Sequence, residues 1–402
     1  METRSKEPST APGAAAVTPR LPLRALVALA TAAFITVLTE ALPAGVLPAM
    51  SAGLGVSEST TGQLVTIYAI GSAIAAIPLS SATASWRRKR LLLTAVAGFA
   101  VANTVTAVSA SFPLTLVARF VAGVAAGLVW ALLAGYARRL APAHLQGKAV
   151  SIVMTGIPAA LALGVPAGTF LGKAVGWQVT FAVMTALAVA LLGWIGAMVP
   201  DFPGQQRGGH TPIARTLAVP GVAPVLFVTL VFVLAHTILY TYVAAFLDRF
   251  GMGGSIDVVL LVFGVASMAS IWIVGAHIDR RLRVLTIGSA VLFAVAAAVL
   301  ALLADSPVLV YLAVTLWGLA YGGAPSLLQT AVGDAGGAAG DTAQAMLVTL
   351  WNTAIAGGGA VGGILLTGPG PLSVPWTVLA LLLPVLVVVL AARAHGFPAR
   401  RA

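Results

Sequence analysis

Residues 23–50 read LRALVALATAAFITVLTEALPAGVLPAM, and this apolar stretch carries one carboxylate, Glu40, well inside it. A hydrocarbon core of about 30 Å needs about 20 residues of helix, so the stretch is long enough to cross a bilayer. A lone acid at such depth costs at least ~2.5 kcal/mol. The first hypothesis is therefore that Glu40 has a functional role.

The composition is that of a membrane protein. Of the 402 residues, 59% are hydrophobic and 8% are charged, whereas soluble domains carry about 25% charged residues. The formal net charge of +11 does not indicate nucleic-acid binding, because the basic residues flank membrane-length segments and act as topology signals. The sequence contains no cysteine, which excludes disulfides and thiolate-bound metal.

Apolar windows separated by Gly, Pro and charged residues predict an all-α polytopic protein with twelve transmembrane helices. We place these helices at residues 23–48, 61–82, 91–110, 114–137, 149–171, 177–199, 221–246, 257–277, 284–304, 307–330, 342–366 and 374–393. If both termini are cytoplasmic, all 22 Lys and Arg residues fall in cytoplasmic segments except Arg119, Lys173 and Arg249. The positive-inside rule therefore predicts an even number of crossings, with both chain ends inside the cell.

The chain is predicted to contain two six-helix halves. The expected organisation is a disordered cytoplasmic tail (1–22), a first bundle (23–199), a cytoplasmic linker (200–220), a second bundle (221–394) and a short cytoplasmic tail (395–402). A shift of 194 positions places Arg87 on Arg281 and Gly164 on Gly358, and the same shift also aligns Lys89 with Arg283 and Gly168 with Gly362. Because each repeat has an even number of helices, we predict parallel repeats related by an axis along the membrane normal.

Several motifs resemble those of the major facilitator superfamily, in particular its twelve-span drug:proton antiporters that include bacterial sugar, purine and chloramphenicol exporters. They comprise Glu40 followed by ALPAGVLP, QLVTIYAIG at 63–71 with Tyr68, Arg119 with Gly123, GVPAG at 164–168, and GAHIDRRLR at 275–283. The resemblance covers about residues 24–394. It implies alternating access between two bundles, a small-molecule substrate, protons and the lipid bilayer as partners, a monomer, no cofactor, and the proton gradient as energy source.

The segment GAHIDRRLR is similar to the family signature GxxxDRxxR. The predicted gating residues here are Asp279, Arg280 and Arg283, because an Asp beside arginines at a helix end can lock helices together at the cytoplasmic face. In the first half, the corresponding position beside Arg87 is Ser85, so an Asp-based lock is not supported there. The alternative interpretation is that these arginines, Arg87 included, only set the topology.

Glu40 and Arg119 are predicted to lie at a similar depth. At ~1.5 Å rise per residue, both are roughly 8–10 Å below the outer ends of their helices. The resemblance implies that both helices line the central cavity, so the two side chains can pair. One hypothesis is a structural ion pair, and the other is a proton-coupling pair in which Glu40 takes up a proton from outside.

The fifth span contains Gly164, Pro166 and Gly168, which predict close helix packing and a bend. The resemblance relates this pattern to the antiporter motif, while plain helix packing is the alternative. For a substrate cavity the candidates are aromatic or hydrogen-bonding residues, with packed or interfacial residues as the competing interpretation. They are Tyr68, Trp130, His236, Tyr240, Trp317, Tyr321 and Asn352. His236 is also an alternative proton carrier.

These observations together predict a proton-coupled exporter of a small organic molecule in the inner (plasma) membrane. The alternatives are a proton-coupled uptake permease for a nutrient and a non-transporting sensor or scaffold. An enzyme is not predicted, because the sequence shows no cluster of nucleophile, base or metal ligands. An ATP-driven pump is also not predicted, because the Gly-rich segments lack the Gly-Lys-Ser/Thr ending of a phosphate-binding loop.

Overall fold

The computed structural model describes residues 21–204, 212–252 and 255–398, and these form helices joined by short turns. Within hydrocarbon every backbone N–H and C=O group needs a partner in the chain, and a helix provides that partner locally. The elements are α1 Leu23–Gly45, α2 Leu47–Leu54, α3 Glu58–Ala82, α4 Arg88–Val108, α5 Phe112–Leu140, η1 Ala143–Leu145, α6 Gln146–Met154, α7 Gly156–Ala159, η2 Ala160–Gly164, α8 Val165–Val175, α9 Trp177–Met198, α10 Ile213–Ala218, α11 Val222–Asp248, α12 Ile256–Leu303, α13 Pro307–Tyr321, α14 Ala324–Gly336, η4 Gly337–Ala339, α15 Gly340–Thr367 and α16 Ser373–Ala391.

Ten continuous helical segments of the described chain are long and apolar enough to cross a membrane, and two of them account for two crossings each. The segment 258–303 has 46 residues, about twice the length that a bilayer needs. It turns back at Arg281, whose backbone is non-helical. The segment 307–367 turns back at Gly337, where φ is positive. The described residues therefore account for twelve crossings.

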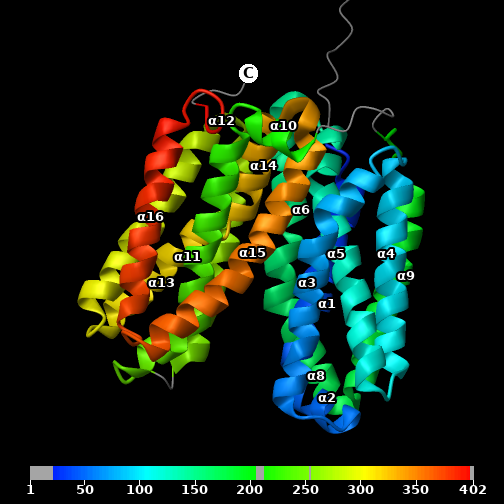
Figure 1. The fold of residues 1–402 in the computed structure, drawn as a ribbon, viewed down its shortest axis with the longest axis horizontal. Coiled ribbons are helices and arrows are strands. Elements are labelled where there is room, and N and C mark those ends of the chain that lie inside the picture. Colours follow the sequence, from blue (N-terminus) through cyan, green and yellow to red (C-terminus); the bar gives the residue numbers. More distant parts are fainter. Residues whose placement is uncertain (1–20, 205–211, 253–254, 399–402) are drawn as a thin grey trace, which may run out of the picture.

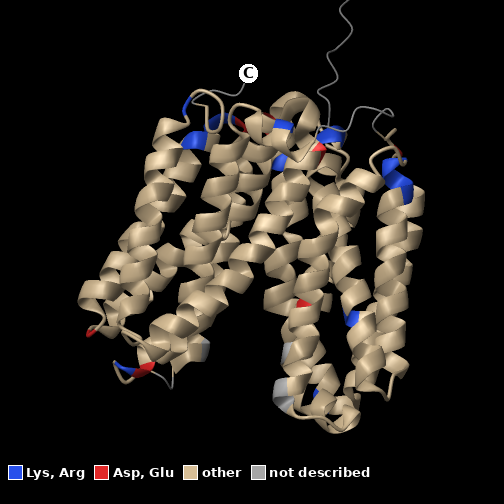
Figure 2. Cartoon of the chain, viewed as in Figure 1, with Lys and Arg blue, Asp and Glu red and all other residues tan. Residues whose placement is uncertain are grey.

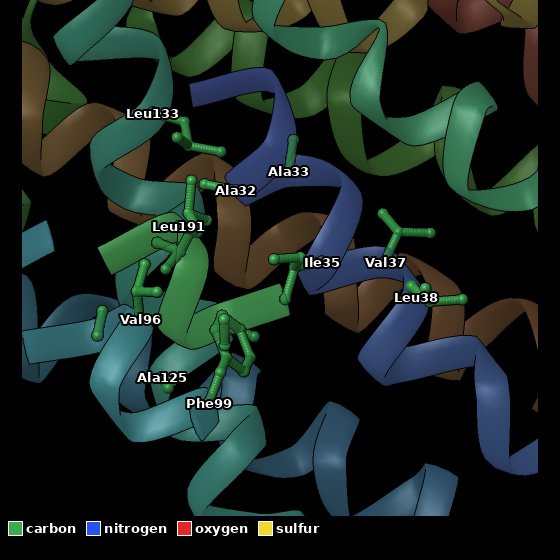
Figure 3. Packing of buried hydrophobic residues seen from close by; sticks show 14 of the residues in the cluster. Ala32, Ala33, Ile35, Val37, Leu38, Val96, Phe99, Ala125, Leu133 and Leu191 are labelled. Carbon is green, nitrogen blue, oxygen red and sulfur yellow. The ribbon is translucent and has the colours of Figure 1, made fainter. Parts of the chain in front are cut away.

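The helices form two bundles, seen side by side in Figure 1. One hydrophobic core is formed almost entirely by residues between Ala25 and Val199, and a second by residues between Val222 and Phe397. Figure 3 shows part of the first core, to which α1, α4, α5 and α9 all contribute side chains, among them Phe99, Leu133 and Leu191. The prediction of an all-α fold with twelve helices in two bundles is confirmed.

The internal repeat is visible in matching helix contacts. Gly123 and Gly127 of α5 lie against the backbone of α3 at Tyr68 and Ser72. In the second bundle Gly318 and Gly322 lie in the same way against the backbone of α12 at Phe263 and Ser267. All four equivalences have a spacing of 195, one residue more than the shift found in the sequence. Each half thus contains one helix pair locked by close backbone approach.

The fifth helix of each half packs on the first helix of that half. Gly164 faces Phe34 of α1, and Gly358 of α15 faces Thr237 of α11. A bend was predicted at Pro166, and the residues just before it, Ala160–Gly164, form a π-helical turn. Pro166 has no N–H to donate to the preceding turn, which explains why the regular α-helix is interrupted there.

Charged residues gather at one end of the bundles, the end at which the C-terminus lies in Figures 1 and 2. We call this the charged end. It contains the following residues: Arg87, Arg88, Lys89, Arg90, Arg138, Arg139, Lys148, Asp201, Asp279, Arg280, Arg281, Arg283, Asp334 and Asp341. The ribbons of the two halves approach each other here and diverge toward the opposite end (Figure 1).

The predicted domain limits stay predictions, since parts of them lie outside the described residues: 1–20, 205–211 and 399–402. Two observations bear on them. The short helix α10 lies within the predicted linker. Phe397, placed in the predicted C-terminal tail, is fully buried in the second core.

Candidate functional site

Arg119 and Glu40 lie on facing helices inside the first bundle. The Arg119 side chain is fully buried on α5, and its Nη2 donates to the backbone carbonyl of Glu40 at 3.5 Å, near the limit of a hydrogen bond. Its Nε donates to the carbonyl of Leu64 at 3.4 Å, and the guanidinium lies 4.8 Å from the centre of the Tyr68 ring. Sequence reasoning correctly brought these helices together at this depth.

The expected side-chain pairing of Glu40 with Arg119 is not formed in this conformation. Arg87, Arg88, Arg138 and Arg139 form ion pairs at up to 4.0 Å within the described chain, and none of these pairs joins Arg119 to Glu40. Nη1 of Arg119 is buried and has no hydrogen-bond partner among the described residues. A buried guanidinium with an unused donor is costly, so this site has the capacity to bind one more acceptor.

Tyr68 is packed in place beside this pair. Its side chain is almost fully buried, and its hydroxyl donates to the carbonyl of Thr36 on α1 at 3.0 Å. Its ring forms the surface on which the Arg119 guanidinium rests, a cation–π contact. Tyr68 therefore positions Arg119 in this conformation, and its predicted contact with substrate stays a prediction.

An aromatic cluster occupies the corresponding region of the second bundle. His236 of α11 stacks on Tyr321 of α13 with a centroid distance of 3.3 Å, and it also contacts Tyr240, Trp317 and Phe263. Tyr240 is 43% exposed, whereas Trp317 is fully buried. Four of the predicted substrate-cavity residues are thus brought together, and Phe263 of α12 is a member that sequence reasoning missed.

One hydrogen bond defines the role of the His236 ring. Nε1 of Trp317 donates to Nδ1 of His236 at 3.1 Å. The indole N–H is only a donor, so Nδ1 must be an unprotonated acceptor and the ring proton is on Nε2. A second proton on His236 would break this bond within a buried aromatic cluster.

The remaining predicted cavity residues lie apart from that cluster. Trp130 of α5 is half-buried against the first core. Asn352 of α15 donates to the carbonyl of Val348 at 2.9 Å and toward the hydroxyl of Ser72 on α3 at 3.4 Å. The Asn352 amide therefore bridges the two halves, and its predicted contact with substrate stays a prediction.

Three ion pairs join the halves at the charged end. Asp341, at the start of α15, accepts from Arg88 of α4 and, at 3.4 Å, from Arg139 of α5. Asp334 of α14 accepts from Arg138 of α5 at 2.6 Å. The Arg88 side chain is only 4% exposed. We call these five residues the gate.

Sequence reasoning did not identify the gate. It used the three arginines only for topology, and it gave no role to Asp334 and Asp341. A usable signal exists, because the two acids lie on either side of the short turn between the tenth and eleventh spans. That turn is expected on the same side as the arginines.

Asp279, from the signature-like segment, also connects the halves. Its carboxylate accepts the backbone N–H groups of Gly147 at 2.5 Å and Lys148 at 2.8 Å. These amides belong to the first turn of α6, where a helix favours a negative charge. Asp279 thus ties α12 of the second half to α6 of the first half.

The other predicted gating residues act within one half in this conformation. Arg283 donates to the carbonyls of Val389, Leu390 and Phe397, so it fixes the end of α16. Arg280 is exposed. Their roles in gating stay predictions.

Arg87 pairs at 2.5 Å with Asp201, which follows α9 in the same half. Asp201 supplies the carboxylate that the motif lacks at Ser85, and sequence reasoning missed it. The slight burial of Asp201 opposes ionisation. Hydrogen bonds from the Lys89 amide and from Arg87 nevertheless hold the pKa of Asp201 below its ordinary value.

The described residues contain no group of three His, Asp or Glu side chains placed to hold a metal ion. The chemistry of the site therefore comes from one acid, one arginine, an aromatic cluster, and ion pairs between the halves. Such a set can bind, move a proton and change conformation.

Comparison with known proteins gives three findings. The sequence profile described as Major Facilitator Superfamily matches residues 29–363. A chloramphenicol efflux pump of Mycobacterium tuberculosis is 31% identical over 365 residues, covering 87% of each chain. A purine ribonucleoside efflux pump of Escherichia coli (strain K12) is 28% identical over 346 residues, covering 84% of this chain and 87% of the relative.

A solved structure also matches the fold. It is the proton:xylose symporter XylE, bound to 6-bromo-6-deoxy-D-glucose, with a TM-score of 0.76 and 14% identity. The match covers 92% of this chain and 95% of the symporter. At this identity the likeness concerns the fold alone.

Proposed function

The chain belongs to the Major Facilitator Superfamily and is a multi-pass membrane transporter, and from this premise we propose that it exports a small organic molecule in exchange for protons. In this proposal the two bundles rock about a central site, and the gate closes the charged end. Glu40 carries the proton. The transporter lies in the plasma membrane as a monomer.

The proposed orientation puts the charged end in the cytoplasm. Support comes from the Lys and Arg residues, which gather there while few lie at the opposite end (Figure 2). The positive-inside rule then puts both termini in the cytoplasm. A conformation joined at the charged end would be the one in which protons and released cargo exchange with the outside.

The observation that carries the proposal is the unused Nη1 donor of Arg119 beside Glu40. Rotation of the Glu40 side chain would bring its carboxylate onto this donor and stabilise the ionised acid. In the present conformation Arg119 bonds Glu40 only at its backbone carbonyl, so the carboxyl group can accept a proton. Changing this contact during rocking couples proton binding to conformation.

His236 is the weaker candidate for the proton carrier. Its Nδ1 already accepts the Trp317 indole proton, and its ring is held between aromatic side chains. We therefore assign His236 to substrate binding. Its Nε2–H group and the exposed Tyr240 give the aromatic cluster two hydrogen-bonding groups for a flat, uncharged ligand.

The class of cargo is proposed from the relatives and from this cluster. The two relatives are named for chloramphenicol and purine ribonucleosides, and both ligands combine an aromatic ring with hydroxyl groups. Such molecules match stacking surfaces with a few polar groups. We propose an uncharged aromatic compound of this kind as cargo.

The test is transport in proteoliposomes with an imposed pH gradient, using radiolabelled inosine and chloramphenicol. With one-to-one exchange, a gradient of one pH unit supports up to about tenfold accumulation, since one unit equals ~1.4 kcal/mol. Glu40→Gln should abolish this accumulation but retain exchange of labelled for unlabelled cargo. The matched control is Asp248→Asn, an exposed acid at the opposite end, which should behave as wild type.

Each contrary outcome has a definite meaning. Gradient-driven accumulation by Glu40→Gln at the wild-type level would remove Glu40 from the mechanism. Cargo movement in the same direction as protons would replace export by uptake. If neither inosine nor chloramphenicol moves or binds, the proposed cargo class is wrong.

A further inference from the structure

A row of buried polar side chains runs along one face of α14. Ser326, Gln329 and Thr330 follow the i, i+3, i+4 spacing of a single helix face. Each is at most 6% exposed. The Oγ of Ser326, the Oε1 of Gln329 and the Oγ1 of Thr330 have no hydrogen-bond partner among the described residues.

Two further residues extend this row across the boundary between the halves. Gln344 of α15 donates through Nε2 to the carbonyl of Gln329 at 2.7 Å, while its Oε1 is buried without a partner. Ser151 of α6, whose buried hydroxyl has no partner, packs against Gly275 of α12, and one turn further along α6 the sulfur of Met154 accepts from Nε2 of Gln329 at 3.1 Å. We call Ser151, Ser326, Gln329, Thr330 and Gln344 the polar seam.

The polar seam differs from the hydroxyl groups inside each bundle. Buried threonines such as Thr36, Thr106, Thr229 and Thr286 all donate to the carbonyl four residues earlier in their own helix. Because each partner lies in the same helix, these hydroxyls stay hydrogen-bonded when the helix moves relative to its neighbours. The seam residues leave hydrogen-bonding groups unused, which costs free energy in a permanently closed interface.

The seam lies directly beneath the gate. Thr330 is one helical turn before Asp334, and Arg138 donates to both the Thr330 carbonyl and the Asp334 carboxylate. Gln344 is one turn beyond Asp341. Gln344 also lines a cavity of about 1420 Å³ at the charged end, formed by both halves. Opening the gate would thus join this cavity to the seam.

We infer that the polar seam is the surface that binds cargo when it enters from the charged end. This inference rests on the proposed export function. The seam contains three hydroxyls, two amide carbonyl oxygens and no formal charge. The amide oxygens only accept, and the hydroxyls accept as well as donate, so without a formal charge to pair with, the ligand chemistry is an uncharged molecule with several O–H or N–H donors, such as a nucleoside.

The test uses the fact that the natural sequence has no cysteine. Ser326→Cys and Ser151→Cys place a thiol on either side of the seam with little change in volume. Thr286→Cys is the control, because Thr286 is equally buried near the charged end but lies inside one bundle. The probe is a positively charged, membrane-impermeant methanethiosulfonate reagent, applied to the protein in nanodiscs.

We expect Ser326→Cys and Ser151→Cys to react at least tenfold faster than Thr286→Cys, and faster again when Asp341→Asn weakens the gate. Inosine or chloramphenicol should slow the reaction of both seam cysteines at least threefold. Seam thiols that react no faster than the control in either background would overturn the inference. Reaction without protection by either compound would show a hydrated seam with no part in cargo binding.

The outcome is separable from the test of export. Normal gradient-driven transport together with unreactive seam cysteines would refute the seam alone. Protected, reactive seam cysteines in a protein that shows no proton-driven accumulation would keep the binding surface and refute proton coupling.

Discussion

The gate predicts a large and specific response to loss of one carboxylate. Asp341 accepts from Arg88, whose side chain is 4% exposed, and from Arg139, which is 35% exposed. Asp341→Asn leaves the Arg88 charge nearly buried and without its ionised partner. Removing one member of a buried pair costs about 3–5 kcal/mol, whereas an exposed pair contributes about 0–1 kcal/mol.

These values set the expected shift in conformation. Because Asp341 is itself 23% exposed, we take the lower limit of about 3 kcal/mol. Opening of the charged end restores water around Arg88, so the cost falls on the closed conformation only. At 1.4 kcal/mol per factor of ten, the open-to-closed ratio should rise about 100-fold. The Arg138–Asp334 pair remains and limits the effect.

Spin-label distances provide the assay. Ala143→Cys and Ala338→Cys put labels on opposite halves at the rim of the charged-end cavity, where both residues are exposed. In Asp341→Asn the distance distribution should gain a longer component. Ser85→Cys with Ala143→Cys, both in the first half, should show no change.

The matched control is Asp201→Asn, which breaks an ion pair of the same chemistry. Arg87 and Asp201 both belong to the first half, so their loss affects both conformations equally. Its distance distribution should match that of wild type. If Asp341→Asn also matches wild type, the Arg88–Asp341 pair does not hold the halves together and the reasoning fails.

Three further predictions concern stability, measured as the thermal unfolding midpoint. Gly322→Ala should lower the midpoint, because overpacking against the Ser267 backbone costs about 1–3 kcal/mol of stability. Gly264→Ala should leave it unchanged, because a Cβ there meets open space. Arg283→Gln should cost about 1.5–3 kcal/mol per lost charged hydrogen bond, and an equal effect of Arg280→Gln at its exposed position would contradict this. Because the pKa of Asp201 is lowered in the fold, the stability that its carboxylate contributes is complete above about pH 4 and is lost as the pH falls through the lower folded pKa. The difference in unfolding midpoint between wild type and Asp201→Asn should therefore be constant between pH 8 and 5, and a change in that range would refute this.

The order of the helices was predictable because each crossing is an autonomous apolar unit. The breaks within long helices were harder to predict. The segment between the eighth and ninth spans was expected to be a loop, yet α12 continues through it with one non-helical residue, Arg281. The tenth span was expected to be continuous, yet it divides at Gly322 and Gly323, where the chain packs closely on α12. In both cases the position of the helix break depends on packing against other helices.

The candidate functional sites were also predictable only in part. Depth along a helix follows from counting residues, which is why Glu40 and Arg119 were placed at one level. Which atoms meet depends on the rotation of each helix, and Arg119 reaches the Glu40 carbonyl instead of its carboxylate. The gate was not predictable from local patterns, because Arg88 and Asp341 are far apart in sequence and meet only when the halves assemble.

The distribution of chemistry between the halves supports the proposal that transport uses their relative motion. The first half holds the acid and the buried arginine, and the second half holds the aromatic cluster around His236. Within each half, close backbone contacts at glycines such as Gly123 and Gly318 make helix pairs rigid, so a change at Glu40 cannot be absorbed locally. The contacts between the halves include ion pairs, side-chain hydrogen bonds and unsatisfied polar groups, all of which water can replace, besides apolar contacts such as that of Ile271 with the first core. In the proposed mechanism, proton binding at Glu40 in the first half and cargo binding in the second half would both act on this interface.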